Sequence, residues 1–427
     1  MDKKEKQKFL ESLDDLNQDF PIGYINVGLV IENLDNPDLV YYIGWTDQYI
    51  DLEPSQKYHV DDPLEYEEQI VQQLCIKYRY GRYWFMYNQP GGNELSRDYV
   101  KLEKGQEYQL LPDDRICIGS LEFQVQRFNT GVYQDQGGRR TMEDALVCIQ
   151  DIGISFNFHA SFYAVFDGHG GQGCVQFCSK QLVENLRNYI VEDGDLDKSD
   201  KFYRYMYDSL QESIQQTDLD FFEKNNNSKK SLDSGCVACI VIIFGNVLIC
   251  SNIGDCRGLI SRNGKLIHIS KDHKPYNLLE RRRIQEAGGY VEFNRVNGKL
   301  GVSRAFGDFR FKKEENQAGT DIVQVEPDIR SMILNFAIDE FLVIACDGLF
   351  DVFSNQQCID FVRNKLLENP LCEQDPQEIA KLLVQEGIAK SNNIKKSPDN
   401  ISVVIVLFSR GISNLKVGKA SCKYSDD

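Results

Sequence analysis

Four apolar, strand-like runs in this chain each end or begin beside an aspartate. "FYAVF" leads to Asp167, "VLICSNIG" to Asp255 and "FLVIAC" to Asp347, while Asp399 comes just before "ISVVIVLF". A single Asp-Gly after a strand is ordinary turn chemistry. Four such residues together are better explained as metal ligands, because clustered carboxylates repel one another unless hard cations neutralise them. Oxygen ligands select Mg²⁺ or Mn²⁺ over zinc.

The stretch "FYAVFDGHGGQG" also contains the G-x-G-x-x-G pattern of a dinucleotide-binding turn. That interpretation requires a second strand, closed by an acidic residue about twenty residues further on. The chain beyond Gly173 instead has the periodicity of one long amphipathic helix. Its apolar face carries Val175, Cys178, Leu182, Leu186 and Ile190. The dinucleotide interpretation is therefore not favoured.

Further candidate residues stand close to these aspartates in the sequence. Asp351 follows Asp347 by four positions, so a helical turn there would present both carboxylates to one cation. Gly168 has no Cβ, which would let its backbone carbonyl approach a metal. In "GGRRTMEDALV", Glu143 and Asp144 precede a strand-like run.

Arg139, in the same stretch, offers a bidentate fork suited to phosphate. Taken alone, an Arg-rich turn before an acidic pair is more typical of a surface salt-bridge cluster. The chain has only five histidines, which argues against a metal site built from imidazoles. The formal net charge of −17 opposes the counterion release that drives binding to nucleic acid.

The chain contains no apolar run of eighteen residues and no secretory leader, so we expect a soluble protein of the cytoplasm or nucleus. Its thirteen cysteines are scattered through apolar runs, which favours reduced core thiols. Cys236 and Cys239 form a C-x-x-C, but in a strand they would face opposite sides, so a zinc site is not expected. Arg257 follows Cys250 one position too late for the motif of a cysteine phosphatase.

Four regions are expected along the chain. Residues 1–20 form a charged lead-in, and residues 21–127 read as short strands separated by turns, which indicates a small all-β module. From 128 to 408 strands and helices both occur without regular alternation, including two antiparallel strands joined at Gly245-Asn246. Residues 409–427 form a polar tail.

The region 128–408 resembles the metal-dependent serine/threonine protein phosphatases of the protein phosphatase 2C class. The resemblance rests on a series of motifs in order: "GGRRTMEDA", "VFDGHGG", "SGCVACI", "SNIGDCRG", "KDHKP", "RRRIQEAGGYV", "RVNGKLGVSRAFGDF", "EPDI", "FLVIACDGLFDVFS" and "SPDNISVVIV". It implies an α+β fold in which two antiparallel sheets form a sandwich flanked by helices, with the active site at one end.

The resemblance also implies roles for the candidate residues. It places Asp167 between two metal ions, with Glu143 and the Gly168 carbonyl at one ion and Asp347 and Asp399 at the other. It also places a weaker third ion among Asp255, Asp347 and Asp351. Asp144 would lie behind these ligands. Arg139 would hold the substrate phosphate and His169 would protonate the leaving group. The implied cofactors are two or three Mg²⁺ or Mn²⁺ ions, and the implied substrates are phosphoserine and phosphothreonine proteins. The alternative is an inactive scaffold that keeps the fold and recruits partners.

Residues 21–127 resemble a forkhead-associated domain through "YYIGWTDQYIDL", "IVQQLCIKYRYGRYWFMYN" and "LLPDDRICIGSLEFQVQRF". Such domains hold phosphothreonine with an Arg after the first Gly, but Trp45 follows Gly44 here. In the preferred register, Val71 and Leu74 stand at the usual Ser and His positions, and only Asn93 has a counterpart. An alternative register uses Ser55 and His59, but it leaves a long insertion before the next strand. Because the main cationic donor is missing, we expect a module that docks a protein partner or packs on the phosphatase domain.

Overall fold

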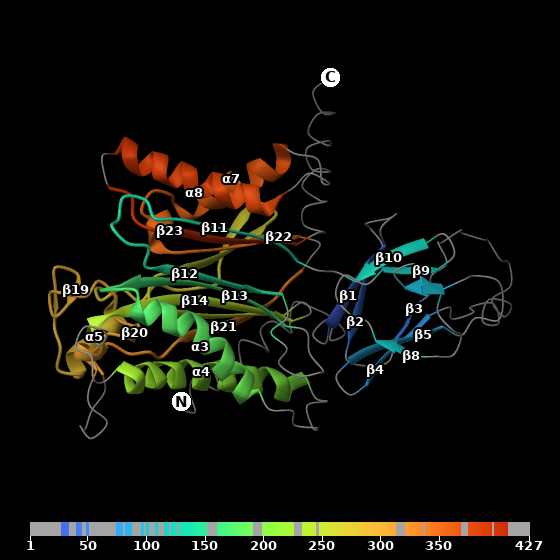
Figure 1. Ribbon diagram of the computed structural model, residues 1–427, viewed down its shortest axis with the longest axis horizontal. Helices are drawn as coiled ribbons and strands as arrows, with labels where there is room; N and C mark the ends of the chain where they lie inside the picture. The colour runs from blue at the N-terminus through green and yellow to red at the C-terminus, as the bar shows by residue number, and fades with distance from the viewer. Residues whose placement is uncertain are drawn as a thin grey trace.

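The computed structural model describes most of the chain after residue 127, and only strand backbones before it (Figure 1). The described residues are 128–150, 152, 160–190, 199–225 (side chains from 205), 233–244, 247–312, 321–335, 338–368, 375–394 and 397–408. The expected lead-in, the polar tail and the turn at 245–246 lie outside the described residues.

Ten strands are described before residue 127, and they pair into two antiparallel sheets. One sheet has the order β2-β1-β10-β9-β6-β7, with β1 Val27–Asn33, β2 Val40–Gly44, β6 Leu95–Arg97, β7 Val100–Lys101, β9 Arg115–Ile118 and β10 Leu121–Val125. The other has the order β3-β4-β5-β8, with β3 Gln48–Ile50, β4 Leu74–Arg79, β5 Arg82–Tyr87 and β8 Glu107–Gln109. This agrees with the expected all-β module. The forkhead-associated likeness remains a prediction, since the side chains that would bind phosphate lie outside the described residues.

Two larger antiparallel sheets form the centre of the region after residue 127. The first has the order β12-β13-β14-β15-β21, with β12 Asp144–Ile149, β13 Ser161–His169, β14 Gly235–Phe244, β15 Val247–Ile253, β21 Asp328–Ile333 and the short β20 Phe306–Gly307 on β14. The second has the order β11-β23-β22-β16-β17, with β11 Asn129–Asp135, β16 Arg257–Arg262, β17 Lys265–His268, β22 Asp339–Ala345 and β23 Ile401–Leu407.

Helices cover both outer faces of this sheet pair (Figure 1). They are α3 Gly173–Tyr189 and α4 Ser199–Asn225 on the first sheet, and α7 Asn355–Glu368 and α8 Pro376–Asn393 on the second. Smaller elements are α5 Leu278–Glu286, the hairpin β18 Val291–Glu292 with β19 Arg295–Val296, the 3-10 turn η3 Phe309–Phe311 and α6 Asp347–Phe350. The predicted helix-flanked antiparallel sandwich is therefore confirmed, and the helix expected after Gly173 is α3.

The side-chain alternation of β13 explains how the layers hold together. Phe162, Ala164 and Phe166 pack under α3 and α4, whereas Tyr163 and Val165 pack between the two sheets. Successive side chains of a strand point to opposite faces, so a strand buried on both faces reads as one continuous apolar run. Asp167 has the parity of Tyr163 and Val165, which directs it between the sheets.

The same alternation separates the two cysteines of the C-x-x-C. Cys236 lies in the helix-facing core, with its sulfur 3.6 Å from that of Cys174, whereas Cys239 lies between the sheets, 3.8 Å from Cys250. All cysteines among the described residues are free thiols. Cys236 and Cys239 therefore face opposite sides of the sheet, as expected from strand alternation.

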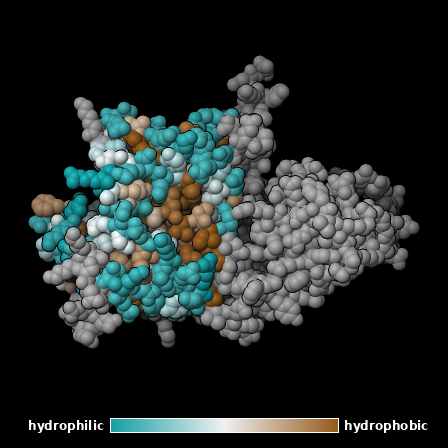
Figure 2. Space-filling model, viewed as in Figure 1, coloured by the Kyte–Doolittle hydropathy of each residue, from teal (hydrophilic) through white to brown (hydrophobic). Residues whose placement is uncertain are grey.

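The outer surface is hydrophilic over the helices, and an apolar area is visible where the sheets reach the surface between the helical layers (Figure 2). None of the helices in the described part of the chain is long and apolar enough to cross a membrane.

Candidate active site

The two sheets bring the four strand-end aspartates to one end of the sandwich. In the first sheet, the carboxyl ends of β13 and β15 both lie beside the start of β14, since Asp167 pairs with Val237 and Ile253 with Ala238. In the second sheet, the end of β22 lies beside the start of β23, where Ala345 pairs with Val403. Antiparallel pairing therefore gathers segments that are far apart in the sequence.

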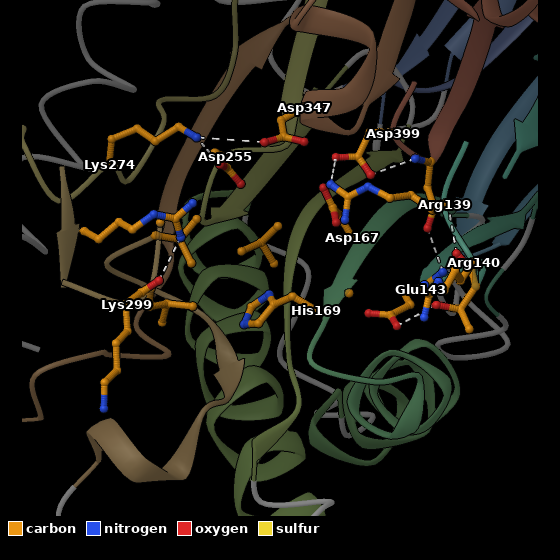
Figure 3. Close-up of a pocket in the computed structure, with 18 residues that line it drawn as sticks. Arg139, Arg140, Glu143, Asp167, His169, Asp255, Lys274, Lys299, Asp347 and Asp399 are labelled. Carbon is orange, nitrogen blue, oxygen red and sulfur yellow. Dashed lines mark hydrogen bonds and ion pairs between the residues drawn. The ribbon is translucent and has the colours of Figure 1, made fainter. Parts of the chain in front are cut away.

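A pocket of about 690 Å³ opens at this end (Figure 3). The predicted site residues that line it are Arg139, Glu143, Asp167, Gly168, His169, Asp255, Asp347 and Asp399. In the close-up, Asp167, Asp255, Asp347 and Asp399 point toward a shared space. The pocket also contains residues for which the sequence predicted no role: Arg140, Lys274, Arg295, Lys299 and Asn400.

The carboxyl groups in the pocket share an unfavourable electrostatic environment. Burial raises the pKa of Asp167 well above its usual value, and the charges of Asp144 and Asp347 raise it further. Burial, followed by the charge of Asp255, raises the pKa of Asp347 to about 7. These oxygen donors therefore fit hard divalent cations, which would replace mutual repulsion by attraction.

Two cationic side chains contact these carboxylates. The guanidinium of Arg139 forms an ion pair with Asp399, and the ammonium of Lys274 forms one with Asp255. The ammonium of Lys274 also lies 3.9 Å from a carboxylate oxygen of Asp347. Lys274 belongs to the "KDHKP" motif, but the sequence predicts no role for it. Its contact with Asp255 depends on how the loop after β17 folds back toward the pocket.

The position of the Arg139 turn depends on Asn400. The Asn400 amide donates to the carbonyls of Gln136 and Thr141, at 2.8 and 3.1 Å, and its side-chain oxygen accepts from the Glu143 N–H at 2.8 Å. One side chain thus fixes the loop that carries both Arg139 and Glu143. In the sequence, the position of Asn400 beside Asp399 was the one indication of a role at the site. Its hydrogen-bond partners could not be predicted, because they lie more than 250 residues away along the chain.

Asp144 lies behind the pocket rather than in it. Its carboxylate accepts a hydrogen bond from the Ser402 hydroxyl at 2.7 Å, and burial raises its pKa to about 6.

Gly168 is required for a reason other than carbonyl approach alone. A Cβ at this position would come within 2.3 Å of the Glu143 carbonyl oxygen.

Asp351 is the one predicted ligand that does not line the pocket. The expected helical turn is present, since α6 begins at Asp347 and the Asp351 N–H donates to the Asp347 carbonyl at 2.9 Å. Asp351 is exposed, and its charge contributes to the raised pKa of Asp347.

His169 has a buried partner that the sequence did not reveal. Its Nε2 lies 2.7 Å from Oδ2 of Asp308, and only 3% of the Asp308 side chain is exposed. Burial lowers the pKa of His169, but the hydrogen bond and charge of Asp308 outweigh burial, so the pKa is raised. Asp308 comes 139 residues after His169, and β20 holds it there by pairing with the start of β14.

Replacing Gly235 by alanine is expected to break this pair. A Cβ at Gly235 would come within 2.2 Å of Asp308 Oδ2 and 2.6 Å of His169 Nε2. We expect kcat for a phosphothreonine peptide to fall at least tenfold, and kcat for an aryl phosphate to fall much less, because a good leaving group needs little protonation. Gly173→Ala is the matched control, since its Cβ would meet nothing closer than 3.6 Å. Equal losses for the two substrates would refute this role of the pair.

Comparisons with known proteins agree with this geometry. A family model described as Protein phosphatase 2C matches residues 128–394. "Probable protein phosphatase 2C 27" of Oryza sativa subsp. japonica is 37% identical over 312 residues, which are 69% of this chain and 82% of that protein. "Protein phosphatase 1L" of Bos taurus is 32% identical over 349 residues, 78% of this chain and 90% of that protein. The crystal structure of serine-threonine phosphatase 2C from Toxoplasma gondii has a TM-score of 0.57 at 20% identity, covering 66% of this chain and 95% of that one.

The helix-flanked double sheet, with acidic side chains gathered at one end, defines a class of phosphatases. This chain belongs to the protein phosphatase 2C family and is a protein-serine/threonine phosphatase.

Proposed function

We propose that this phosphatase hydrolyses phosphoserine and phosphothreonine in proteins with two bound Mg²⁺ or Mn²⁺ ions and no covalent enzyme intermediate. The family is metal-dependent. The observation that carries the proposal is the convergence of Asp167, Asp255, Asp347 and Asp399 on one pocket, where burial and neighbouring carboxylates raise the pKa values of Asp167 and Asp347. An oxygen-only donor set of this kind favours hard cations.

The proposed ligands are those expected from the sequence. Asp167 would lie between the two ions, Glu143 and the Gly168 carbonyl would complete one site, and Asp347 and Asp399 the other. Asp255 and Asp351, with Asp347, remain the predicted ligands of a third ion, and Asp144 would orient the inner ligands. When bound, two such cations lower the pKa of a water molecule and supply the nucleophile for in-line attack on phosphorus.

The chain's own side chains would hold the substrate and move a proton. Arg139 is 60% exposed and reaches Asp399 from the pocket rim, so its guanidinium can turn to a phosphoryl group. His169 would donate the proton from its ring to the departing serine or threonine oxygen, which is otherwise a poor leaving group. Asp308 favours the protonated ring, because its charge raises the pKa of His169.

Metal dependence is the direct test. Purified full-length chain should release phosphate from a phosphothreonine peptide with Mn²⁺ or Mg²⁺, and we expect at least a hundredfold loss in EDTA. Thermal unfolding gives a second readout, since cations that bind only the folded state should raise Tm. Turnover that is unaffected by EDTA would contradict the metal proposal. No turnover and no Tm shift would favour the scaffold alternative.

The amino-terminal module is proposed to dock a protein partner, following its resemblance to forkhead-associated domains. Calorimetry of the chain against phosphothreonine and unphosphorylated peptides tests whether it also binds phosphate. The placement in the cytoplasm or nucleus belongs to the same proposal and accords with the free thiols among the described residues.

A further inference from the structure

More cationic side chains line the pocket than form ion pairs with its carboxylates. They are Arg139, Arg140, Lys274, Arg295 and Lys299. Arg139 and Lys274 already face the carboxylates of Asp399 and Asp255. Within the described part of the chain, neither Arg295 nor Lys299 forms an ion pair. Both side chains are exposed, so their charges are available to a bound anion.

A short, well-fixed turn holds these two cations. The Arg295 guanidinium donates to the Lys299 carbonyl at 2.7 Å, and the Lys299 N–H donates to the Val296 carbonyl at 2.9 Å. Val296, between them, is fully buried in a hydrophobic cluster that also contains residues from between the sheets. The turn is closed at its other side by Tyr290, whose carbonyl accepts from the Asn297 N–H at 2.8 Å. A preorganised turn loses little entropy when it binds a ligand.

Lys299, whose carbonyl accepts the hydrogen bond from Arg295, lies across the pocket from the proposed phosphate-binding arginine. Figure 3 shows Lys299 on the side opposite Arg139 and Arg140, with His169 and the aspartates between them. A phosphorylated residue held at Arg139 would therefore extend its neighbouring residues toward Lys299 and Arg295. Glu292 is the strand partner of Arg295, but no ion pair joins them.

We propose that Arg295 and Lys299 form a second, basic rim that selects phosphoproteins with acidic residues beside the phosphorylated position. The proposal rests on the function proposed above. The argument for it is local charge complementarity. Two exposed cations would attract acidic side chains at this edge of the pocket, whereas the chain as a whole, with a formal net charge of −17, would repel them. Exposed charge pairs contribute modestly, so the effect of two cations should be about three- to tenfold in kcat/KM and should weaken as salt is added.

The test compares matched phosphothreonine peptides with the full-length, Mn²⁺-loaded protein. One peptide has neutral flanks, one has acidic residues before the phosphothreonine, and one has them after it. The measured quantity is the ratio of kcat/KM for each acidic peptide to that for the neutral peptide. The variants are Arg295→Glu with Lys299→Glu, and the control Arg282→Glu. Arg282 is an exposed arginine of α5 that pairs with Glu286 and does not line the pocket.

We expect at least one acidic peptide to be favoured threefold or more by the wild-type protein, and we expect the double variant to bring that ratio to one or below. Arg282→Glu should leave the ratio unchanged. Equal rates for acidic and neutral peptides, or a preference that survives in the double variant, would overturn the rim while leaving the phosphatase proposal intact. If no peptide is hydrolysed under any metal condition, the proposed function fails and the rim falls with it.

Discussion

Replacing Asp167 by asparagine is expected to lower kcat/KM for a phosphothreonine peptide by about a thousandfold or more, because it removes a charged ligand that both proposed cations would share. Asp167 is placed between the sheets, among Asp144, Asp255 and Asp347, whose charges raise its pKa. Asp347→Asn should cause a loss of the same order. Continuous assay of phosphate release in saturating Mn²⁺ measures both.

Asp167→Asn should lose activity without losing the fold. The substitution removes one of several repelling buried carboxyl groups, so Tm in EDTA should equal or exceed that of the wild type. The rise in Tm that Mn²⁺ causes in the wild type should disappear. Asp360→Asn is the matched control, since Asp360 is an exposed residue of α7 remote from the pocket lining. Near-normal turnover in Asp167→Asn would contradict the metal assignment.

Replacing Glu280 by glutamine is expected to reduce the free energy of unfolding by about 3 kcal/mol, or roughly 6 to 12 °C in Tm. The Glu280 carboxylate accepts from Arg304 at 2.6 Å and from Arg283 at 3.0 Å. Arg283 in turn donates to the carbonyls of Ser303 and Asp321, so the carboxylate joins α5 to two other segments. The variant would leave two largely buried guanidinium groups without their counter-charge.

The pH dependence of this loss follows from the pKa of Glu280. Burial raises that pKa, but the hydrogen bond and charge of Arg304 and the charge of Arg283 outweigh burial and lower it to about 2, from 4.5. The carboxylate therefore contributes its full stability above pH 4.5, and the contribution is lost as pH falls from 4.5 toward 2.

Thermal unfolding at pH 7 and at pH 3 should accordingly give a large difference between wild type and Glu280→Gln at the higher pH and a smaller one at the lower. Glu378→Gln, which breaks an exposed pair with Lys381, should not change Tm measurably. A Glu280→Gln protein as stable as Glu378→Gln at pH 7 would show that the two arginines are satisfied without the carboxylate.

Much of the fold was predictable because strand and helix periodicity is a local property. The strands β14, β22 and β23 are buried along their whole length, as is β13 up to Phe166, and such strands appear in the sequence as continuous apolar segments. The apolar face of the helix after Gly173 was also predicted, because its apolar positions recur every three or four residues. All of them lie in the core. One strand pairing was also predicted, since the Gly245-Asn246 turn indicated the antiparallel pair that the structure has as β14 and β15. The pairing of strands that are far apart in the sequence was not predicted, because their hydrogen bonds leave no local pattern.

The candidate site divides in the same way. Asp167, Asp255, Asp347 and Asp399 were identifiable because each stands at the end of a recognisable strand. Asp308 was not, because its role depends on contact with His169 across 139 residues of chain.

The sequence by itself determined the strands and helices, the acidic residues at the strand ends and the family to which the motifs belong. Only the tertiary structure decided that Asp308 supports His169, that Asn400 fixes the Arg139 turn, that Asp351 stays outside the pocket and that Arg295 and Lys299 face it. The physical reason is the separation along the chain between the residues that interact. Periodicity and turn chemistry act over a few residues, whereas charge and hydrogen-bond partners are set by the packing of two sheets that bring distant segments to one edge.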